Sequence, residues 1–399
     1  MAADTSLVRI AERSNPKRSF LLVSTVLGKH LPVGAARCRL AGLALGLAVA
    51  NDPRAADAKT TLLDGTDAEA LSMLDTIETQ PPVDGGPFVV IGFAETATAL
   101  GEQVATALGA TWWQTTTRQA SIAEAGGLRF DESHSHAPDQ WIAKPEGGWP
   151  AGTLVLVDDE LTTGATACNL IELLHEHSPR ERYVVAALLD GRGKAGGGKG
   201  PDSPIKQTAK KLGVKIDVVA LHKRGAEVRT EAGWSGGKLP EQQHGLRRAE
   251  SIREVWLGFD GKLQHEGQDA EARLALADAA MDAAAEVGPL PRGALVLGTG
   301  EHLAFAQRAA VYVSALTSST TRSPVLVSEL EGYPIRDGLA FPNPDGADIA
   351  GFAYNVHAAR RPAIVVHFQD AAHRERGQAL LDTLVAAGAR DVTAVTLAP

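Results

Sequence analysis

A short apolar run that ends in acids and leads into a threonine- and glycine-rich turn constrains this chain more than any other feature. Val155-Leu156-Val157 has the character of a buried parallel strand, and Asp158-Asp159-Glu160 follows it directly. Leu161-Thr162-Thr163-Gly164-Ala165-Thr166 comes next and opens an amphipathic helix that we predict over residues 165–177. Because strand, loop and helix in this order build parallel sheets, the run predicts an α/β domain.

The side chains of this run suit a sugar phosphate. The loop lies at a helix N-terminus, where unpaired N–H groups and the positive end of the helix dipole favour a phosphate. Gly164 lets the backbone approach a ligand closely. Three hydroxyl donors are Thr162, Thr163 and Thr166. Asp158 and Asp159 can accept hydrogen bonds from vicinal hydroxyl groups, so phosphate donors beside diol acceptors indicate ribose 5-phosphate.

The run from Val155 to Thr166 resembles the signature with which type I phosphoribosyltransferases bind phosphoribosyl pyrophosphate (PRPP), and it matches that pattern at every position. The resemblance implies a type I phosphoribosyltransferase fold, a parallel sheet with flanking helices. It also implies that Asp158 and Asp159 hold the ribose diol as catalytic residues and that Leu161–Thr166 bind the 5-phosphate. A capped strand-to-helix turn with incidental acids is the alternative.

A second strand, loop and helix start precedes this run, at Val90-Ile91-Gly92-Phe93-Ala94-Glu95-Thr96. In the resembled enzymes such a loop holds pyrophosphate, so Gly92 and the N–H groups of Phe93–Thr96 are expected to bind it. Glu95 departs from the common pattern, in which a small residue is frequent at this position. A carboxylate here repels pyrophosphate unless a metal ion bridges the two. Mg²⁺, held mainly through PRPP, is the implied cofactor, since it neutralises the leaving pyrophosphate. An ordinary turn is the alternative.

A long polar stretch, Gln119–Pro150, reads as a functional loop. It contains Phe130-Asp131-Glu132-Ser133-His134-Ser135-His136-Ala137. In the resembled enzymes a mobile loop in this region closes over PRPP and excludes water. His134 and His136 are candidate catalytic residues, because histidines can transfer protons near neutral pH. A solvated loop is the alternative, and one His-x-His pair is weak evidence for a metal.

Composition excludes other classes of function. The chain has a formal net charge of −9 and a pI of about 5.8, which does not suit nucleic-acid binding. Two cysteines, Cys38 and Cys168, make neither a disulfide framework nor a zinc cluster. The most apolar window, Leu40–Ala50, is far shorter than the roughly 20 residues of a membrane span. With no signal peptide in the sequence, we predict a soluble, cytoplasmic protein.

Motifs elsewhere in the chain carry a second resemblance. They are Lys17-Arg18-Ser19-Phe20, Ser133-His134-Ser135-His136-Ala137, Thr321-Arg322-Ser323-Pro324 and Ser328-Glu329-Leu330-Glu331-Gly332-Tyr333. With them nearly the whole chain resembles the phosphoribosyltransferase-like family that carries a C-terminal TRSP domain. That resemblance implies an association with bacterial tellurium-resistance and stress gene clusters, and it defines no acceptor.

Strand and helix patterns alternate along most of the chain. We expect strands at residues 88–91, 111–117, 154–157, 183–189, 214–221, 294–297, 363–367 and 392–397, and helices at 96–108, 165–177, 301–314 and 371–387. The first 80 residues read as mostly helical. We predict a phosphoribosyltransferase-like domain over residues 1–235 and a second α/β domain, the TRSP domain, over 236–399.

The two halves share a pattern that we interpret as a degenerate duplication. Gly92–Glu95 is matched by Gly298–Glu301, Thr116-Thr117-Arg118 by Thr320-Thr321-Arg322, Gly127–Phe130 by Gly338–Phe341, and 154–160 by 364–370. Because no Thr-Gly loop follows residue 370, we expect no PRPP site in the second half. Its Glu301, Arg322 and Arg336 are candidates for another ligand, or for the first site across an interface. Chance similarity of α/β units, and an ion pair for Arg322, are the alternatives.

These observations predict a PRPP-dependent phosphoribosyltransferase. It would displace pyrophosphate from C1 of ribose 5-phosphate, through an oxocarbenium-like transition state, to make a nucleotide-like metabolite. The expected partners are PRPP and an unidentified small-molecule acceptor, with neither nucleic acid nor membrane, and a homodimer is left open. Two alternatives stay open as well: a non-catalytic PRPP or nucleotide sensor, and a hydrolase that cleaves a phosphoribosyl bond with water.

Overall fold

The computed structural model describes residues 7–14, 19–83, 86–95, 97–131, 139–192, 200, 203–223 and 236–398. The chain divides into two compact units. The first takes in the described parts of residues 39–228 and 262–273, and the second those of 5–38, 229–261 and 274–399. The domain boundary at 235/236 stays a prediction. Each unit is made of several separate segments of the chain, so no single cut divides the chain into these two units.

The first unit is built on a five-stranded parallel sheet of strand order β10-β9-β8-β4-β5. Its strands are β4 (Phe88–Gly92), β5 (Trp112–Thr115), β8 (Thr153–Leu161), β9 (Arg182–Asp190) and β10 (Lys215–Lys223). Its central strands are apolar and buried, as strands covered on both faces must be. The α/β class predicted from the alternating pattern is therefore confirmed.

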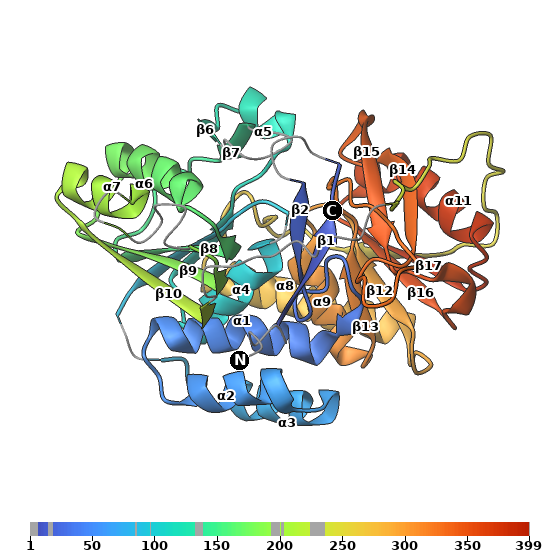
Figure 1. The fold of residues 1–399 in the computed structure, drawn as a ribbon, viewed down its shortest axis with the longest axis horizontal. Coiled ribbons are helices and arrows are strands. Elements are labelled where there is room, and N and C mark those ends of the chain that lie inside the picture. Colours follow the sequence, from blue (N-terminus) through green and yellow to red (C-terminus); the bar gives the residue numbers. More distant parts are fainter. Residues whose placement is uncertain are drawn as a thin grey trace. The chain divides into compact units, whose positions relative to one another are not determined.

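Helices cover this sheet and extend from it (Figure 1). They are α1 (Ala35–Val49), α2 (Arg54–Asp64), α3 (Asp67–Glu78), α4 (Ala97–Ala107), α6 (Ala165–His177) and α7 (Pro204–Leu212). Helix α4 packs on β4, β5 and β8. Gly42 allows α1 to pack closely on α4, since a Cβ atom there would lie 2.4 Å from the Cβ of Gln103. Among the described residues, no helix is both long and apolar enough to cross a membrane.

The stretch expected to be one long loop, Gln119–Pro150, contains regular structure. Helix α5 (Ala120–Glu124) is followed by an antiparallel hairpin of β6 (Leu128–Asp131) and β7 (Asp139–Ile142). Thr117 and Trp141 bridge the hairpin to the end of β5, with Thr117 N–H···O of 2.8 Å and Trp141 N–H···O of 2.9 Å. The expectation was wrong because this pairing is long-range and leaves no periodic signal in a polar sequence.

The second unit holds a six-stranded sheet of order β11-β17-β16-β12-β13-β3, parallel except at β3. Its strands are β3 (Val33–Gly34), β11 (Arg253–Gly258), β12 (Leu295–Gly298), β13 (Leu316–Ser319), β16 (Ile364–Phe368) and β17 (Val392–Ala398). Its helices are α8 (Ala270–Val287), which begins in the first unit, α9 (Leu303–Tyr312), α10 (Ala371–Arg376) and α11 (Gln378–Ala386), with the short η1 (Ala358–Arg360). A hairpin of β14 (Gly338–Asn343) and β15 (Gly346–Tyr354) completes it.

Two local expectations need correction. The first 80 residues, expected to be mostly helical, do contain α1, α2 and α3, but they begin with an antiparallel pair of β1 (Val8–Glu12) and β2 (Phe20–Ser24) before β3. The helix expected over 371–387 is split at Gly377, where a Cβ atom would lie 2.2 Å from the ring of Phe368.

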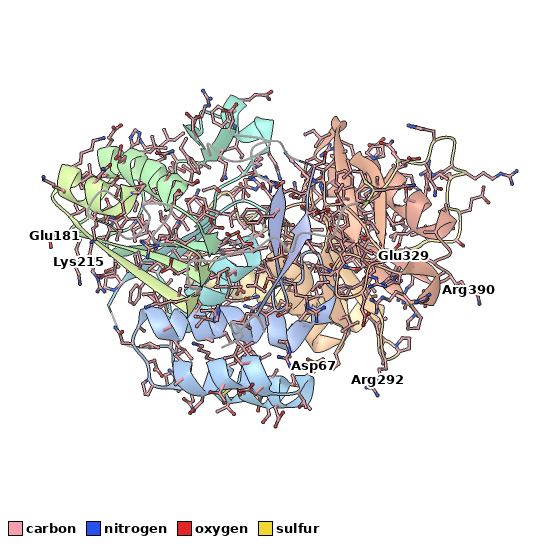
Figure 2. All side chains as sticks on the ribbon, viewed as in Figure 1. Asp67, Glu181, Lys215, Arg292, Glu329 and Arg390 are labelled. Atoms are coloured by element: carbon pink, nitrogen blue, oxygen red, sulfur yellow. The ribbon has the colours of Figure 1, made fainter. Side chains whose placement is uncertain are left out.

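Charged side chains of both units, such as Asp67, Glu181 and Glu329, are exposed (Figure 2).

Candidate functional site

The predicted acids lie within strand β8 rather than after it. Asp158 pairs with Ala187 of β9, and the strand continues to Leu161. Both Asp158 and Asp159 are half-buried, and Asp158 Oδ1 accepts a hydrogen bond of 2.9 Å from the Asp159 N–H. They therefore stand at the carboxyl end of a central strand, which is the edge where ligands bind in parallel sheets.

The predicted phosphate loop has the geometry of a helix N-terminus. Gly164 is the N-cap of α6 with a φ of 85°, a left-handed conformation that favours glycine. A Cβ atom there would also lie 2.8 Å from Ile205. The Thr163 hydroxyl accepts a 3.2 Å hydrogen bond from the Ala165 N–H, and the Thr162 side chain is exposed. The first turn of α6 thus faces a loop whose hydroxyls are partly open to solvent.

The second predicted loop connects β4 to α4 and is tightly packed. A Cβ atom on Gly92 would lie 2.4 Å from the Ala97 carbonyl oxygen. The Phe93 N–H donates to the Val157 carbonyl at 3.0 Å, which fixes the loop against β8. The Ala94 N–H donates to the Thr116 hydroxyl at 2.8 Å.

These bonds correct one expectation. The N–H groups of Phe93 and Ala94 were expected to cradle pyrophosphate, but both already donate within the protein. The reason is burial: both residues are less than 10% exposed, at 4% and 7%, and a buried N–H must find an acceptor. Thr96 of this loop lies outside the described residues. The polar groups that this loop can offer to a ligand therefore come mainly from side chains and not from these two N–H groups.

Glu95 forms an ion pair with Arg118, a residue that the sequence indicated only through the internal repeat. The two side chains are 12% and 11% exposed. Glu95 has a φ of 60°, which a non-glycine residue adopts at a cost on the order of 1 kcal/mol or more. Nearby, the Thr116 hydroxyl donates to Gln140 Oε1 at 2.6 Å. Thr116, Arg118 and Gln140 are thus the residues around this loop that sequence reasoning did not assign to the site.

The two candidate histidines, His134 and His136, lie outside the described residues, which leave out 132–138. The flanking strand residues are described: Arg129 pairs with Asp139 across the hairpin and with Asp131 at 3.2 Å. Among the residues that the structure describes, no three His, Cys, Asp or Glu side chains are grouped so as to hold a metal ion. Cys38 and Cys168 are buried free thiols.

The second unit repeats the backbone bonds of the first. Gly300 N–H donates to the Thr320 hydroxyl at 2.8 Å, as Ala94 N–H does to Thr116. The Thr320 N–H donates to the Gly298 carbonyl at 2.9 Å, the same length as the equivalent bond in the first unit. Thr321 bridges to Phe352 of β15 as Thr117 bridges to β7. The repeat noticed in the sequence is therefore a repeat of structure.

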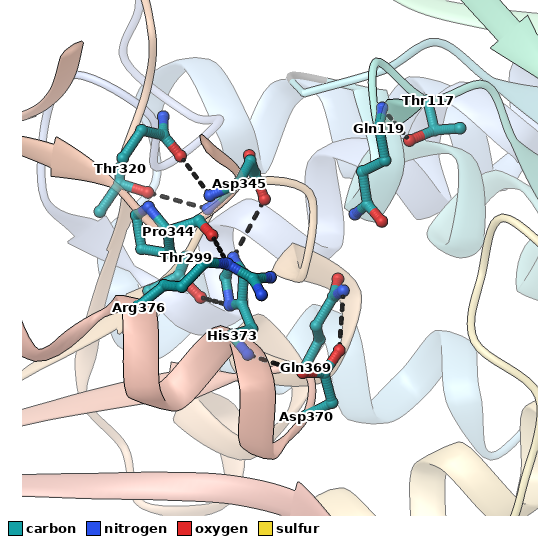
Figure 3. Close-up of polar contacts among 12 residues, drawn as sticks. Thr117, Gln119, Thr299, Thr320, Pro344, Asp345, Gln369, Asp370, His373 and Arg376 are labelled. Carbon is teal, nitrogen blue, oxygen red and sulfur yellow. Dashed lines mark hydrogen bonds and ion pairs between the residues drawn. The ribbon is translucent and has the colours of Figure 1, made fainter. Parts of the chain in front are cut away.

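Polar residues at the carboxyl edge of this second sheet are joined by hydrogen bonds, among them those that link His373 to Asp345 and to Asp370 (Figure 3). Asp345, in the turn between β14 and β15, accepts from Arg322 Nη2 at 2.9 Å and lies 3.0 Å from His373 Nε2. The Asp345 side chain is only 3% exposed. Burial by itself would raise the pKa of this carboxyl group, but the hydrogen bond with His373 and the charges of His373 and Arg322 lower it to about 2.

The three C-terminal candidates therefore have different surroundings. Arg322 is held by Asp345, so the ion-pair alternative is the one observed. Glu301 is buried next to the second glycine loop. Arg336 is exposed and donates from Nη1 to the Leu330 carbonyl at 2.8 Å. Together with Lys238 and Glu329, Arg336 lines a cavity of about 760 Å³, to which neither Arg322 nor Glu301 contributes.

Two buried histidines complete the second unit's edge. His302 stacks on Phe305, with ring centroids 5.1 Å apart, and Phe305 meets His367 edge-on at 5.2 Å. Burial holds the pKa of His367 down at about 3. Burial, together with His367 and His373, also holds the pKa of His302 well below its usual range. Both rings are therefore neutral at physiological pH.

Comparison with known proteins decides the family. The model of a family described as phosphoribosyl transferase matches residues 7–225, more than half of the chain. The chain belongs to the phosphoribosyl transferase family. This confirms the enzyme class and the α/β fold predicted from Val155–Thr166. Residues 261–384 match the TRSP domain, described as lying C-terminal to that transferase domain. No curated protein matches the chain.

Solved structures of phosphoribosyltransferases are similar to part of the chain. Adenine phosphoribosyltransferase from Rhodothermus marinus is 18% identical over 40% of this chain and 85% of its own, with a TM-score of 0.26. The Giardia lamblia enzyme is 19% identical over 40% and 85%, with a TM-score of 0.25. Orotate phosphoribosyltransferase from Aeropyrum pernix is 20% identical over 39% and 70%, with a TM-score of 0.22. The assignment rests on the family match.

Proposed function

We propose that the first unit transfers the phosphoribosyl group of PRPP to a small-molecule acceptor and releases pyrophosphate. The product would be a nucleotide-like metabolite. One observation carries the proposal: in a member of this family, Asp158 and Asp159 lie near the carboxyl end of a central strand, and a short loop leads from that strand to Gly164, the N-cap of α6. The Phe93–Val157 hydrogen bond brings the glycine loop after β4 against the same strand.

Each part has a chemical role in this proposal. Asp158 and Asp159 accept hydrogen bonds from the ribose hydroxyls and face the positive charge that develops at C1 as the bond to pyrophosphate breaks. Leu161–Thr166 bind the 5-phosphate with N–H groups at the start of α6 and with threonine hydroxyls. The loop Gly92–Glu95 and Arg118 lie on the pyrophosphate side. His134 or His136 would close over the bound substrate and exclude water.

Mg²⁺ fits this arrangement only as a companion of the substrate. The described residues provide no group of three side chains for a metal, whereas Mg²⁺ commonly binds one or two carboxylates together with substrate phosphates. When bound through PRPP, it neutralises charge on the leaving pyrophosphate. We further propose a cytoplasmic location and the tellurium-resistance and stress association that the family resemblance implies. Assembly as a homodimer is left open.

Isotopically labelled PRPP tests the proposed reaction. The full-length protein is incubated with labelled PRPP in a cell extract, and products are followed by mass spectrometry beside a pyrophosphate assay. We expect one labelled nucleotide-like product, formed together with pyrophosphate and absent with Asp159→Asn. Release of labelled ribose 5-phosphate in place of that product would favour the hydrolase. Tight PRPP binding without turnover would favour the sensor.

A further inference from the structure

The pyrophosphate side of the proposed site carries a negative side chain where its ligand is also negative. The loop's buried N–H groups at Phe93 and Ala94 are already bonded to Val157 and Thr116. Among the described residues of this loop, Glu95 is charged, and it pairs with Arg118. A ligand that reaches this loop must therefore contend with that ion pair.

The position of Glu95 is fixed from several sides. Its carbonyl oxygen accepts a 3.1 Å hydrogen bond from the Thr98 hydroxyl, and its φ of 60° is an unusual conformation for glutamate. That backbone conformation is unfavourable for a residue other than glycine, and it is tolerated only where surrounding contacts hold it. About a tenth of each charged side chain stays exposed, so the pair remains within reach of a solute.

The second unit shows that this pairing is not a requirement of the frame. The matching arginine, Arg322, pairs with Asp345 from the turn after β14 and not with a residue of its own glycine loop. Asp345 is 3% exposed, so that pair is closed to solutes. A partly exposed arginine held by its own loop's carboxylate is thus particular to the first unit.

We propose that Glu95 makes the first unit selective for diphosphate that carries Mg²⁺ over metal-free diphosphate. The inference rests on the proposed function, which places a diphosphate at this loop. A metal-free diphosphate competes with Glu95 for Arg118 and leaves the Glu95 carboxylate facing like charge in a largely dehydrated place. The magnesium complex satisfies both residues, since a phosphate oxygen can meet Arg118 while the cation lies toward Glu95.

Calorimetric titration of the full-length protein with inorganic pyrophosphate tests this, once in Mg²⁺ and once with a chelator. We expect the wild-type protein to prefer the magnesium complex by about tenfold or more, since like charges held close together in partly buried surroundings repel each other strongly. Glu95→Gln keeps the shape and a hydrogen-bond acceptor for Arg118. In this variant we expect metal-free binding to strengthen and the preference to shrink to about twofold.

Matched variants make the outcome specific. Glu181→Gln removes one charge from an exposed surface position (Figure 2), and we expect it to keep the wild-type preference. Glu95→Gly removes the carboxylate with a residue suited to the left-handed backbone, and so serves if the glutamine variant unfolds. An undiminished preference in either folded Glu95 variant would overturn the inference alone. Wild-type protein that binds neither pyrophosphate nor PRPP would overturn the proposed function as well.

Discussion

The two units place the same backbone pattern at the carboxyl edge of their sheets, yet among the described residues only the first unit has the side chains of the proposed PRPP site. Asp158 and Asp159 of β8 correspond to Phe368, the last residue of the matching strand β16, and to Gln369, which follows it. Gly164 opens α6 in the first unit, whereas Asp370 caps α10 in the second, accepting from the His373 N–H at 2.7 Å. At this place the first unit has a loop whose threonine hydroxyls are partly open to solvent. The second unit has a carboxylate, that of Asp370, which is bonded to its own helix.

This difference shows that two parallel α/β sheets can share the same backbone bonds at their carboxyl edges while the side chains that would bind a ligand differ. The bonds that shape the glycine loops, from Ala94 to Thr116 and from Gly300 to Thr320, have the same length of 2.8 Å. They are backbone-to-hydroxyl bonds, so they can stay the same while the other side chains of the two loops differ. We interpret the second unit as a copy whose edge has become structural, with Asp345 filling the place of an anionic ligand beside Arg322.

The largest expected effect is on the stability of the second unit. Asp345→Ala would leave Arg322 and His373 without their shared acceptor, and breaking a buried pair in this way costs about 3–5 kcal/mol. Denaturant unfolding monitored by circular dichroism measures the loss. Asp345→Asn, which keeps an acceptor oxygen, should cost less. A loss below about 1 kcal/mol for the alanine variant would contradict a structural role for the network.

Ribose recognition should be sensitive in the first unit only. Asp159→Asn removes a charged acceptor, and losing a hydrogen bond to a charged group costs about 1.5–3 kcal/mol, so PRPP affinity should fall about tenfold or more. Gln369→Ala, at the matching place in the second unit, should leave the affinity unchanged. The dissociation constants come from calorimetry. Unchanged values for both Asp158→Asn and Asp159→Asn would remove these residues from the site.

The shared frame predicts a cost in both units. Thr116→Val and Thr320→Val each leave a buried N–H, at Ala94 or Gly300, without its acceptor, which costs about 1–3 kcal/mol. Denaturant unfolding of both variants gives the two values. We expect the larger loss for Thr116→Val, because this change also removes the donor of the 2.6 Å hydrogen bond to Gln140. A cost in one unit and none in the other would contradict the structural equivalence.

The smallest effect concerns pH and belongs to the second unit. His367 has a pKa of about 3 in the folded protein against an ordinary 6.5, so the unfolded chain binds a proton first as pH falls. The stability that neutral His367 contributes is therefore fully present above pH 6.5 and is lost as pH falls toward 3, by about 1.4 kcal/mol per pH unit. Thermal unfolding between pH 7.5 and 5 should show a shallower dependence in His367→Leu. An unchanged dependence would contradict the assignment.

Local patterns predicted the elements that position the candidate site. Helix α6 begins and ends at the predicted residues, Ala165 and His177, because its amphipathic spacing and Gly164 are both local signals. The strands β4, β9, β12 and β17 also fall where apolar runs placed them, within one residue or two. Sequence motifs found the acids and the glycine loops for the same reason.

What the sequence did not predict depends on contacts between distant residues. Arg322 and Asp345 are joined only when the turn after β14 folds over the sheet, and nothing periodic marks that pairing. The break at Gly377 follows from its closeness to Phe368 and not from helix propensity. Likewise, β3 joins the second unit through antiparallel pairing with β13, which lies far along the chain.

The most direct test of the account is the number of PRPP molecules bound by one chain. Calorimetric titration of PRPP with Mg²⁺ into the full-length protein measures it. We predict one equivalent, bound in the first unit and weakened by Asp159→Asn but not by Gln369→Ala. A second equivalent of comparable affinity would contradict the account, as would binding that Gln369→Ala weakens and Asp159→Asn leaves intact.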